Sequence, residues 1–293
     1  MNPIAVTGAG GFLGTHLGEV LENNGYTYIH LARDVRAFPD RMRSWLAQSK
    51  PAAIIHLAGV SEVGFGMEHP VEAFQSNVAE TATMLESLRQ YSPETPVIYV
   101  ASDKSFGEQE SCGLKTSYRP SFPYETSKAC EDMLVECYAK AYAFPAFLLR
   151  FPNFFGEADR HLSRLIPGIC AALARGEIFI VRTRLDGTSR QYIYVRDAAQ
   201  IIVKTLESVL GGRSAWPKSH FAPPHVKTVG GVIADVEAVT GRKLNLEILN
   251  LPGEVSRLTL KDENCLDYAY TDWLVALERT AHWYLKACSS GIL

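Results

Sequence analysis

Short apolar runs alternate with segments of helical length through the first half of this chain, and this alternation restricts the fold more than any other feature. Apolar runs of this length are typical of strands buried on both faces of a parallel sheet. The segments between them are long enough to form helices that cover such a sheet. The pattern therefore predicts an α/β fold, with strands near residues 4–8, 26–32, 52–59, 96–102 and 146–151 and helices near 12–23, 71–91 and 126–143.

Three glycines follow the first apolar run, in the sequence VTGAGGFLG. Glycine permits a tight turn and a close backbone approach to a ligand, and the free N–H groups at a helix N-terminus attract a pyrophosphate. A turn without any ligand would also use glycines, but their position directly after the first strand favours a dinucleotide site. We therefore predict that the cofactor phosphates bind at Gly8, Gly11, Phe12, Leu13 and Gly14.

The end of the second predicted strand bears on the form of the cofactor. Dinucleotide folds place a carboxylate there to bind the adenosine ribose, about 20 residues beyond the glycines. This chain has Ala32 and Arg33 instead. Without a carboxylate a 2′-phosphate is accepted, and Arg33 or Arg36 can pair with it. The sequence therefore favours NADP, and NAD remains an alternative because Asp34 lies only two residues from Ala32.

The composition is that of a globular protein, with 293 residues of which 47% are hydrophobic and 21% charged. A formal net charge of -3 provides no basic surface for nucleic acid and no polybasic patch for a membrane. No segment approaches the roughly 18 apolar residues that a membrane span needs. The six cysteines form no CxxC motif and no cluster with histidine, so neither a metal site nor a disulfide framework is predicted. We expect a cytoplasmic protein with reduced thiols and without nucleic-acid or membrane partners.

A tyrosine and a lysine stand four residues apart in the sequence YETSK. This spacing places Tyr124 and Lys128 on one face of a helix that begins near Glu125. A nearby ammonium and a cationic nicotinamide favour the phenolate, whose parent phenol has an ordinary pKa of about 10. Ser102 ends the fourth predicted strand, where it can hydrogen-bond the same hydroxyl. A solvated pair is the simpler interpretation of Tyr124 and Lys128 alone, but together with Ser102 and the glycine loop they predict a catalytic group.

Over essentially its whole length, the sequence resembles the extended short-chain dehydrogenase/reductases, which are nucleotide-sugar epimerases, dehydratases and reductases. The matching segments run from TGAGGFLG near the N-terminus to LERTAHWY at residues 277–284. The resemblance implies that the cofactor is also contacted by Leu57, Ala58, Gly59, Asn77, Tyr124 and Lys128. His56 precedes this set, and we expect it to be a packed strand histidine.

The resemblance also implies where a nucleotide-sugar substrate binds. Asn153, in RFPNFFG, would meet the substrate, and Leu165 and Ile166, in SRLIPGI, would pack on its nucleotide. Arg190, in RQYIYVRDAA, would bind the diphosphate.

Two charged residues directly follow Ser102, and they distinguish reaction types within the resemblance. Reductases and epimerases need little beyond the Ser, Tyr and Lys set, whereas elimination of water from a sugar also needs groups that act at C5 and C6. A serine followed by Asp and Lys resembles the CDP-glucose 4,6-dehydratases. This implies that Asp103 protonates the leaving C6 oxygen while Tyr124 takes the C4 hydroxyl proton. Lys104 would assist at C5.

Other interpretations of this sequence remain open. Asp103 and Lys104 would have no catalytic role if they formed only a surface ion pair. An NADPH-dependent 4-ketoreductase or a 4-epimerase would use the same fold, as would a non-catalytic nucleotide-binding regulator.

The strand and helix alternation fades after residue 151. We predict a Rossmann-type, doubly wound parallel sheet with a smaller mixed C-terminal substrate lobe. Residues 1–155 would form the dinucleotide domain, to which 180–210 returns, and residues 156–293 would form the interleaved lobe. The resemblance further implies a homodimer, formed through the helices that carry Tyr124 and Lys128, with a contact face at Cys130, Met133, Leu134, Cys137 and Tyr138.

Overall fold

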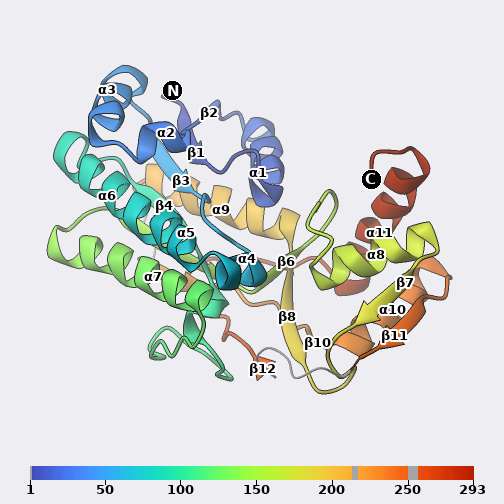
Figure 1. Cartoon of the computed structure of the whole chain (residues 1–293). Coiled ribbons are helices and arrows are strands. Elements are labelled where there is room, and N and C mark those ends of the chain that lie inside the picture. Colours follow the sequence, from blue (N-terminus) through green and yellow to red (C-terminus); the bar gives the residue numbers. More distant parts are fainter. Residues whose placement is uncertain (1, 213–216, 250–256) are drawn as a thin grey trace.

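The protein is described by a computed structural model that covers residues 2–212, 217–249 and 257–293. Within these residues the central sheet has six parallel strands in the order β2-β1-β3-β4-β5-β9 (Figure 1). Every residue of β1 and β3 is buried, as expected of strands covered on both faces. The predicted α/β fold is confirmed. The strands are β1 (Ile4–Thr7), β2 (Tyr28–His30), β3 (Ala53–His56), β4 (Val97–Ser102), β5 (Ala146–Phe151) and β9 (Lys218–His220).

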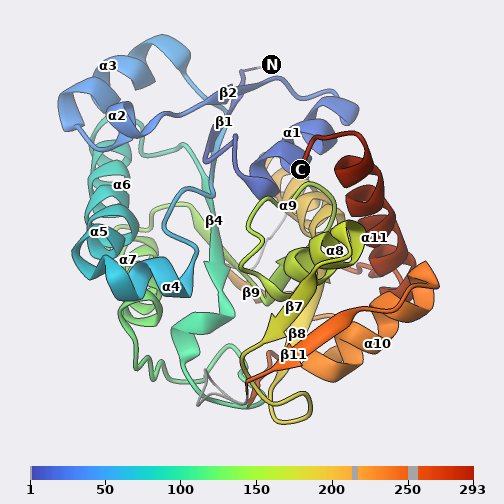
Figure 2. The same cartoon turned by 45° about the vertical axis from the view of Figure 1, so that its right-hand side comes forward.

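Helices lie on both faces of the sheet (Figures 1 and 2). Successive strand side chains point to opposite faces, so Ile4 and Val6 join one core cluster and Ala5 joins another. The first cluster includes residues of α1 (Phe12–Asn23) and α9 (Val195–Leu210). The second includes residues of α3 (Pro39–Ser49), α6 (Glu80–Tyr91) and α7 (Pro123–Ala141).

The smaller part of the molecule is mixed and built around β8. This strand pairs with β6, β10 and β12, while β7 and β11 form a separate parallel pair. Figure 2 shows α8, α10 and α11 beside this pair. Its elements are β6 (Asn153–Phe155), α8 (Leu165–Arg175), β7 (Ile178–Val181), β8 (Ser189–Tyr194), β10 (Val226–Thr228), α10 (Val229–Thr240), β11 (Asn245–Ile248), β12 (Arg257–Leu258) and α11 (Trp273–Ser289).

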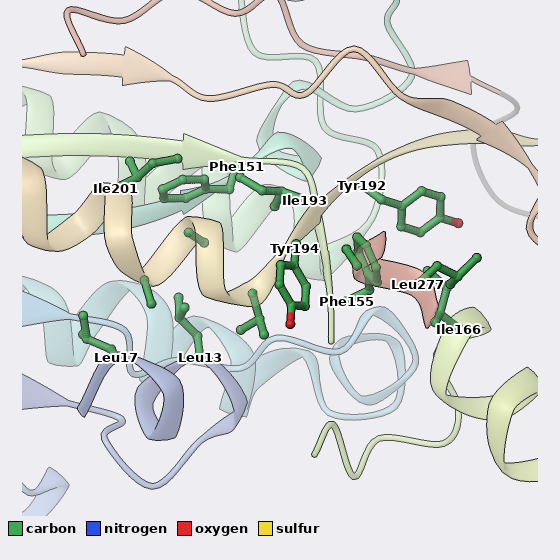
Figure 3. Packing of buried hydrophobic residues seen from close by; sticks show 14 of the residues in the cluster. Leu13, Leu17, Phe151, Phe155, Ile166, Tyr192, Ile193, Tyr194, Ile201 and Leu277 are labelled. Atoms are coloured by element: carbon green, nitrogen blue, oxygen red, sulfur yellow. The ribbon is translucent and has the colours of Figure 1, made fainter. Parts of the chain in front are cut away.

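One hydrophobic core joins the sheet to this smaller part. Figure 3 shows Leu13 and Leu17 of α1 in the same cluster as Phe155 of β6, Ile166 of α8 and Leu277 of α11. The chain also crosses between the two parts more than once. The helix α9 packs against α1, and β9 pairs with β5 of the central sheet. The division into two domains at residue 155 remains a prediction, and the two parts on either side of it share one hydrophobic core.

Several boundaries differ from those predicted. Only Tyr28–His30 pairs as β2, and α7 begins at Pro123 because proline is well suited to the first position of a helix. The expected helix at 71–91 is divided into α5 (Pro70–Phe74), a π-helical turn η1 (Gln75–Ala79) and α6. Two further short helices, α2 (Arg33–Arg36) and α4 (Val63–Glu68), precede it. In the part of the chain that the structure describes, no helix is long and apolar enough to cross a membrane.

Candidate active site

The carboxyl end of β4 turns sharply into a short 3-10 helix, η2 (Asp103–Phe106). The Ser102 hydroxyl oxygen accepts the Lys104 amide at 3.2 Å, which begins this turn as an N-cap. The Ser105 hydroxyl donates to the Ser102 carbonyl at 2.6 Å. These local bonds hold two consecutive charged residues at the edge of the sheet where the parallel strands end.

Tyr124 lies on α7 beside this turn and is only 5% exposed. Ser102 is among the groups that act on its hydroxyl. Burial raises the pKa of Tyr124, although Lys128 and Ser102 act in the opposite direction. Asp103 and Glu131 raise it further through their charge. The structure thus brings Ser102, Tyr124 and Lys128 together, and burial of Tyr124 opposes the phenolate that Lys128 favours.

The ammonium of Lys128 is buried beside a carboxylate. Its Nζ atom donates to Glu131 Oε2 at 2.6 Å and lies 5.4 Å from the centre of the Tyr99 ring. Burial alone would lower the pKa of Lys128, but Glu131 and then Tyr124 outweigh it and raise that pKa. Lys128 is therefore held as a cation next to the tyrosine.

Asp103 and Lys104 are both buried, with exposed fractions of 2% and 8%. The Ser102 hydroxyl donates to Asp103 Oδ1 at 3.3 Å, and Lys104 Nζ lies 3.8 Å from the same oxygen. Within the described residues, Asp103 Oδ2 and Lys104 Nζ have no hydrogen-bond partner. The ion pair between Asp103 and Lys104 is therefore buried and not at the surface as in the alternative above, and it leaves two charged atoms without a hydrogen bond.

The glycine loop is shaped for a close backbone approach. Gly8 has a φ of +68°, and a Cβ atom there would lie 2.9 Å from the Ala58 amide nitrogen. The N-cap residue of α1 is Gly11, which has no side chain to cap the helix, so the amides of Phe12 and Leu13 are available to a phosphate. The predicted loop and the segment after β3 are thus in contact, and together they fit the phosphates of a dinucleotide.

A cavity of about 320 Å³ adjoins the glycine loop at the end of β2, and Arg33 and Arg36 are among its lining residues. Arg33 donates to Glu80 Oε1 at 2.6 and 2.8 Å, and Arg36 Nη2 lies 2.9 Å from Glu80 Oε2. Arg36 Nη1 is buried without a hydrogen-bond partner in the described chain. Asp34 is 70% exposed and pairs with Arg41. Asp34, the carboxylate nearest in sequence, is not among the residues that line this cavity.

Asn77 lies in the π-helical turn η1 and is fully buried. Its side chain accepts the Val60 amide at 2.7 Å, donates to the Val60 carbonyl at 3.2 Å and donates to the Ser127 hydroxyl at 2.9 Å. Gly59 lies against it, because a Cβ atom there would approach Asn77 Oδ1 to 2.6 Å. Asn77 thus links the loop at Val60, which follows Leu57, Ala58 and Gly59, to Ser127 of α7.

The predicted substrate residues lie in the smaller part of the molecule. Asn153 donates to the Gln191 carbonyl at 3.1 Å, and Arg190 is 8% exposed with Nη1 donating to the Ser189 carbonyl at 3.0 Å. Leu165 begins α8, and the Ile166 side chain is packed in the core. Their roles toward a substrate remain predictions.

Two buried carboxylates, Glu80 on α6 and Glu131 on α7, were not predicted from the sequence. Glu80 pairs with both arginines at the β2 end, and Glu131 pairs with Lys128. The second had a visible signal, since an acidic residue three positions after a lysine on a helix can reach it. No group of His, Cys, Asp or Glu side chains suited to a metal ion occurs among the described residues.

Comparisons with known proteins agree with this architecture. Residues 4–215 match the model of the NAD dependent epimerase/dehydratase family. A UDP-glucose 4-epimerase of Rhizobium leguminosarum bv. trifolii is 29% identical over 279 residues, which cover 84% of each protein. A dTDP-glucose 4,6-dehydratase of Mycobacterium tuberculosis is 26% identical over 79% of this chain and 71% of that protein. A CDP-glucose 4,6-dehydratase of Salmonella typhimurium is also 26% identical, over 64% of this chain and 55% of that protein.

Solved structures share the fold at lower identity. A UDP-glucose 4-epimerase from Thermotoga maritima with UDP-glucose superposes with a TM-score of 0.83 at 19% identity, over 98% of this chain and 99% of that chain. A dTDP-glucose 4,6-dehydratase from Bacillus anthracis in complex with NAD gives 0.82 at 20% identity, over 98% and 97%. The family match covers residues 4–215, which is more than half of the chain. Together with the fold, the glycine loop and the pair of Tyr124 and Lys128 on α7, this match shows that the chain belongs to the NAD dependent epimerase/dehydratase family.

Proposed function

We propose that this chain is a nucleotide-sugar 4,6-dehydratase, which converts a nucleotide-linked hexose into its 4-keto-6-deoxy form. The observation that carries the proposal is the pair of buried charged atoms, Asp103 Oδ2 and Lys104 Nζ, which lack hydrogen-bond partners within the described residues. They follow Ser102 directly and lie in the same site as Tyr124, whose pKa Asp103 raises. Although the two side chains form an ion pair at 3.8 Å, buried charged atoms without a hydrogen bond are costly, and a ligand explains them more readily than the fold alone.

Each residue has a role in this reaction. When bound, a nicotinamide cofactor would supply the oxidation at C4 and the reduction at C6. Tyr124 takes the C4 hydroxyl proton, with Ser102 orienting its hydroxyl and Lys128 stabilising the phenolate. Asp103, when protonated, gives its proton to the C6 oxygen as water leaves. Lys104, when its amine is neutral, takes the C5 proton as the enolate forms and returns it to C5 when C6 is reduced.

Two other activities have some support. The relative that is 29% identical carries the name UDP-glucose 4-epimerase, and epimerisation needs only the Ser102, Tyr124 and Lys128 set. A 4-ketoreductase would suit the arginines at the end of β2. Neither activity gives a reason for Asp103 Oδ2 and Lys104 Nζ to be buried without a hydrogen bond.

The direct test is to incubate the protein with a panel of nucleotide-glucose substrates and no added reductant. We expect mass spectrometry to show loss of water from one of them. Inversion at C4 without loss of water would identify an epimerase, and stoichiometric NADPH oxidation with a 4-keto sugar would identify a reductase.

The substitution Asp103→Asn tests the carboxyl group itself. We expect it to lower kcat by about 10²–10⁴-fold, the usual contribution of a general acid, and to leave cofactor affinity unchanged. Asp34→Asn, which alters an exposed carboxylate, is the control and should keep full activity. Undiminished dehydration by the Asp103→Asn protein would exclude Asp103 as the acid.

For the cofactor, we propose NADP rather than NAD. Support comes from the cavity at the end of β2, whose lining includes Arg33 and Arg36. Position 32, which also lines it, is an alanine and not an aspartate. One carboxylate, Glu80, opposes two guanidinium groups there, and this leaves a net positive charge for a 2′-phosphate. Because the hydride returns to the sugar, either cofactor would support dehydration.

Titration of the protein with each cofactor tests this preference. We expect NADP⁺ to bind more tightly than NAD⁺, and Arg33→Ala to weaken NADP⁺ binding about 10-fold or more while hardly altering NAD⁺ binding. Arg41→Ala, at a neighbouring exposed arginine, should change neither affinity. Tighter binding of NAD⁺ by the unaltered protein would refute the 2′-phosphate interpretation.

A further inference from the structure

Glu131 is fully buried and has no role in the reaction described above. One of its oxygens, Oε2, accepts from Lys128 Nζ at 2.6 Å. The other, Oε1, accepts from the Thr81 hydroxyl at 3.1 Å and lies 3.6 Å from His56 Nε2. A carboxylate excluded from water and bonded on both oxygens is expensive to bury unless its position matters or its partners compensate it.

The hydrogen bonds continue from Glu131 to the cofactor loop. His56 Nε2 lies 3.1 Å from Thr81 Oγ1, and His56 Nδ1 lies 2.8 Å from Thr7 Oγ1. Thr7 directly precedes Gly8, and its hydroxyl oxygen accepts the amides of Leu57 and Ala58 at 3.0 and 3.1 Å. The three linking side chains, Thr7, His56 and Thr81, are each at most 1% exposed.

The direction of each bond follows from the donors available. Because Thr7 Oγ1 already accepts two amides, its own proton is left to donate to His56 Nδ1, which must then be unprotonated. A neutral His56 carries its proton on Nε2 and donates it to Thr81, whose hydroxyl proton goes to Glu131. The donors therefore all point toward one ionised carboxylate. Burial lowers the pKa of His56, which agrees with a neutral ring.

We propose that Glu131 is a positioning residue that fixes the Lys128 ammonium beside Tyr124, and that Thr7, His56 and Thr81 fix Glu131 relative to the cofactor loop. The proposal rests on the proposed function only in assuming that Lys128 acts together with Tyr124. It assigns no direct contact with substrate to Glu131.

The electrostatic consequence follows from the burial of Lys128. Burial disfavours an ammonium, and Glu131 is the main group that opposes this effect and raises the pKa of Lys128. Replacing Glu131 by glutamine removes the charge and places an amide donor or a weaker acceptor against the ammonium. The charged and titratable groups that interact with Glu131 are Arg36, His56, Tyr99, Tyr124 and Lys128, and Asp132 also acts on Lys128. Among these, Lys128 forms the shortest contact with Glu131, so it should respond most.

The experiment follows the Lys128 side chain by NMR in protein labelled with ¹³C-lysine, with the resonance assigned from a Lys128→Arg protein. We expect Glu131→Gln to lower the pH at which Lys128 loses its proton by at least about one unit, a change of roughly tenfold in its acid dissociation constant. In turnover assays, the alkaline limb of kcat should move to lower pH in the same variant.

Two further variants distinguish positioning from a general loss of structure. Glu136 lies on the same helix as Glu131 and pairs with Lys218 of β9. Glu136→Gln removes that ion pair and should leave the Lys128 titration unchanged. Glu131→Asp keeps the charge and should shift the titration less than Glu131→Gln does, and it serves as the test if the glutamine variant does not fold. Identical Lys128 titrations in the wild type and in the folded Glu131 variants would overturn the proposal.

The two parts of the experiment fail separately. The NMR titration needs no substrate, so a shifted Lys128 without dehydration of any nucleotide sugar would remove the proposed function and retain the role of Glu131. Dehydration of a nucleotide sugar, together with an unchanged Lys128 titration in the Glu131 variants, would retain the proposed function and remove the role of Glu131.

Discussion

Gly14 is a position of the glycine loop at which a side chain cannot be accommodated without movement of the backbone. A Cβ atom there would lie 2.3 Å from the Gly8 carbonyl oxygen and 2.6 Å from that of Ala9. Gly10, in the same loop, has no atom within 4 Å of the corresponding position. Since Gly14 lies inside α1, alanine would otherwise be favoured there by roughly 1 kcal/mol. The steric conflict must exceed this gain.

We therefore expect opposite behaviour from two glycine substitutions. Gly14→Ala should lower the free energy of unfolding by about 1–3 kcal/mol, the usual cost of overpacking, and should weaken cofactor binding because the loop is displaced. Gly10→Ala should leave the free energy of unfolding within about 0.5 kcal/mol of the wild type. Urea denaturation followed by circular dichroism measures both values. A Gly14→Ala protein as stable as the Gly10→Ala protein would contradict the loop geometry.

The elements that were predicted best are those whose pattern depends only on local sequence. The strand β4 is a continuous apolar run that ends in Ser102, and the strands β1, β3, β4 and β5 all lie within the segments predicted for them. By contrast, β11 (Asn245–Ile248) is short and exposed at every residue, so no apolar run marks it. Such strands form because a neighbouring element supplies the hydrogen bonds, and a sequence pattern does not contain that information.

The π-helical turn at Gln75–Ala79 shows a second limit. The expected helix at 71–91 was continuous, because nothing in its periodicity distinguishes an ordinary helical turn from a wider one. The wider turn accompanies the three side-chain bonds of Asn77 to Val60 and Ser127, which lie on other elements. Long-range bonds of this kind can be known only after the fold is known.

For the candidate site, too, the local sequence patterns could be predicted but the long-range contacts could not. Ser102, Asp103, Tyr124 and Lys128 were found because strand ends and a four-residue helical spacing bring them to one place. The contact between Glu131 and His56 was not found, because it depends on how α7 is rotated against β3. A sequence gives the faces of a helix but not which face meets which strand.

Across the whole molecule, a second buried polar cluster joins segments that are far apart in the chain. Arg150 of β5 is fully buried, pairs with Asp132 of α7 and donates to the Ser102 carbonyl at 3.2 Å. Its Nη1 atom lies 2.7 Å from His220 Nε2 on β9. Because a guanidinium can only donate, His220 must accept with an unprotonated Nε2 atom. The cluster thus requires a neutral histidine at the edge of the central sheet.

This requirement makes the stability of the folded protein depend on pH. Burial, followed by the charges of Arg150 and Lys218, lowers the pKa of His220 to about 3. In the unfolded chain a histidine titrates near its ordinary pKa of about 6.5. Between these two values the unfolded state binds a proton that the folded state does not. The contribution of His220 is therefore complete above about pH 6.5 and is lost progressively as the pH falls toward 3.

From pH 7.5 to pH 5 the loss due to His220 alone should be about 2 kcal/mol, since the lower pH lies roughly 1.5 units below the unfolded pKa. Urea denaturation at both pH values measures the change in the free energy of unfolding. In His220→Gln, whose amide oxygen can still accept from Arg150, the change should be smaller than in the wild type by about that amount. His282→Gln, at an exposed position on α11, should retain the wild-type change and serves as the control. An equal pH dependence in His220→Gln and the wild type would mean that His220 titrates alike in the folded and unfolded states, contrary to its buried contact with Arg150.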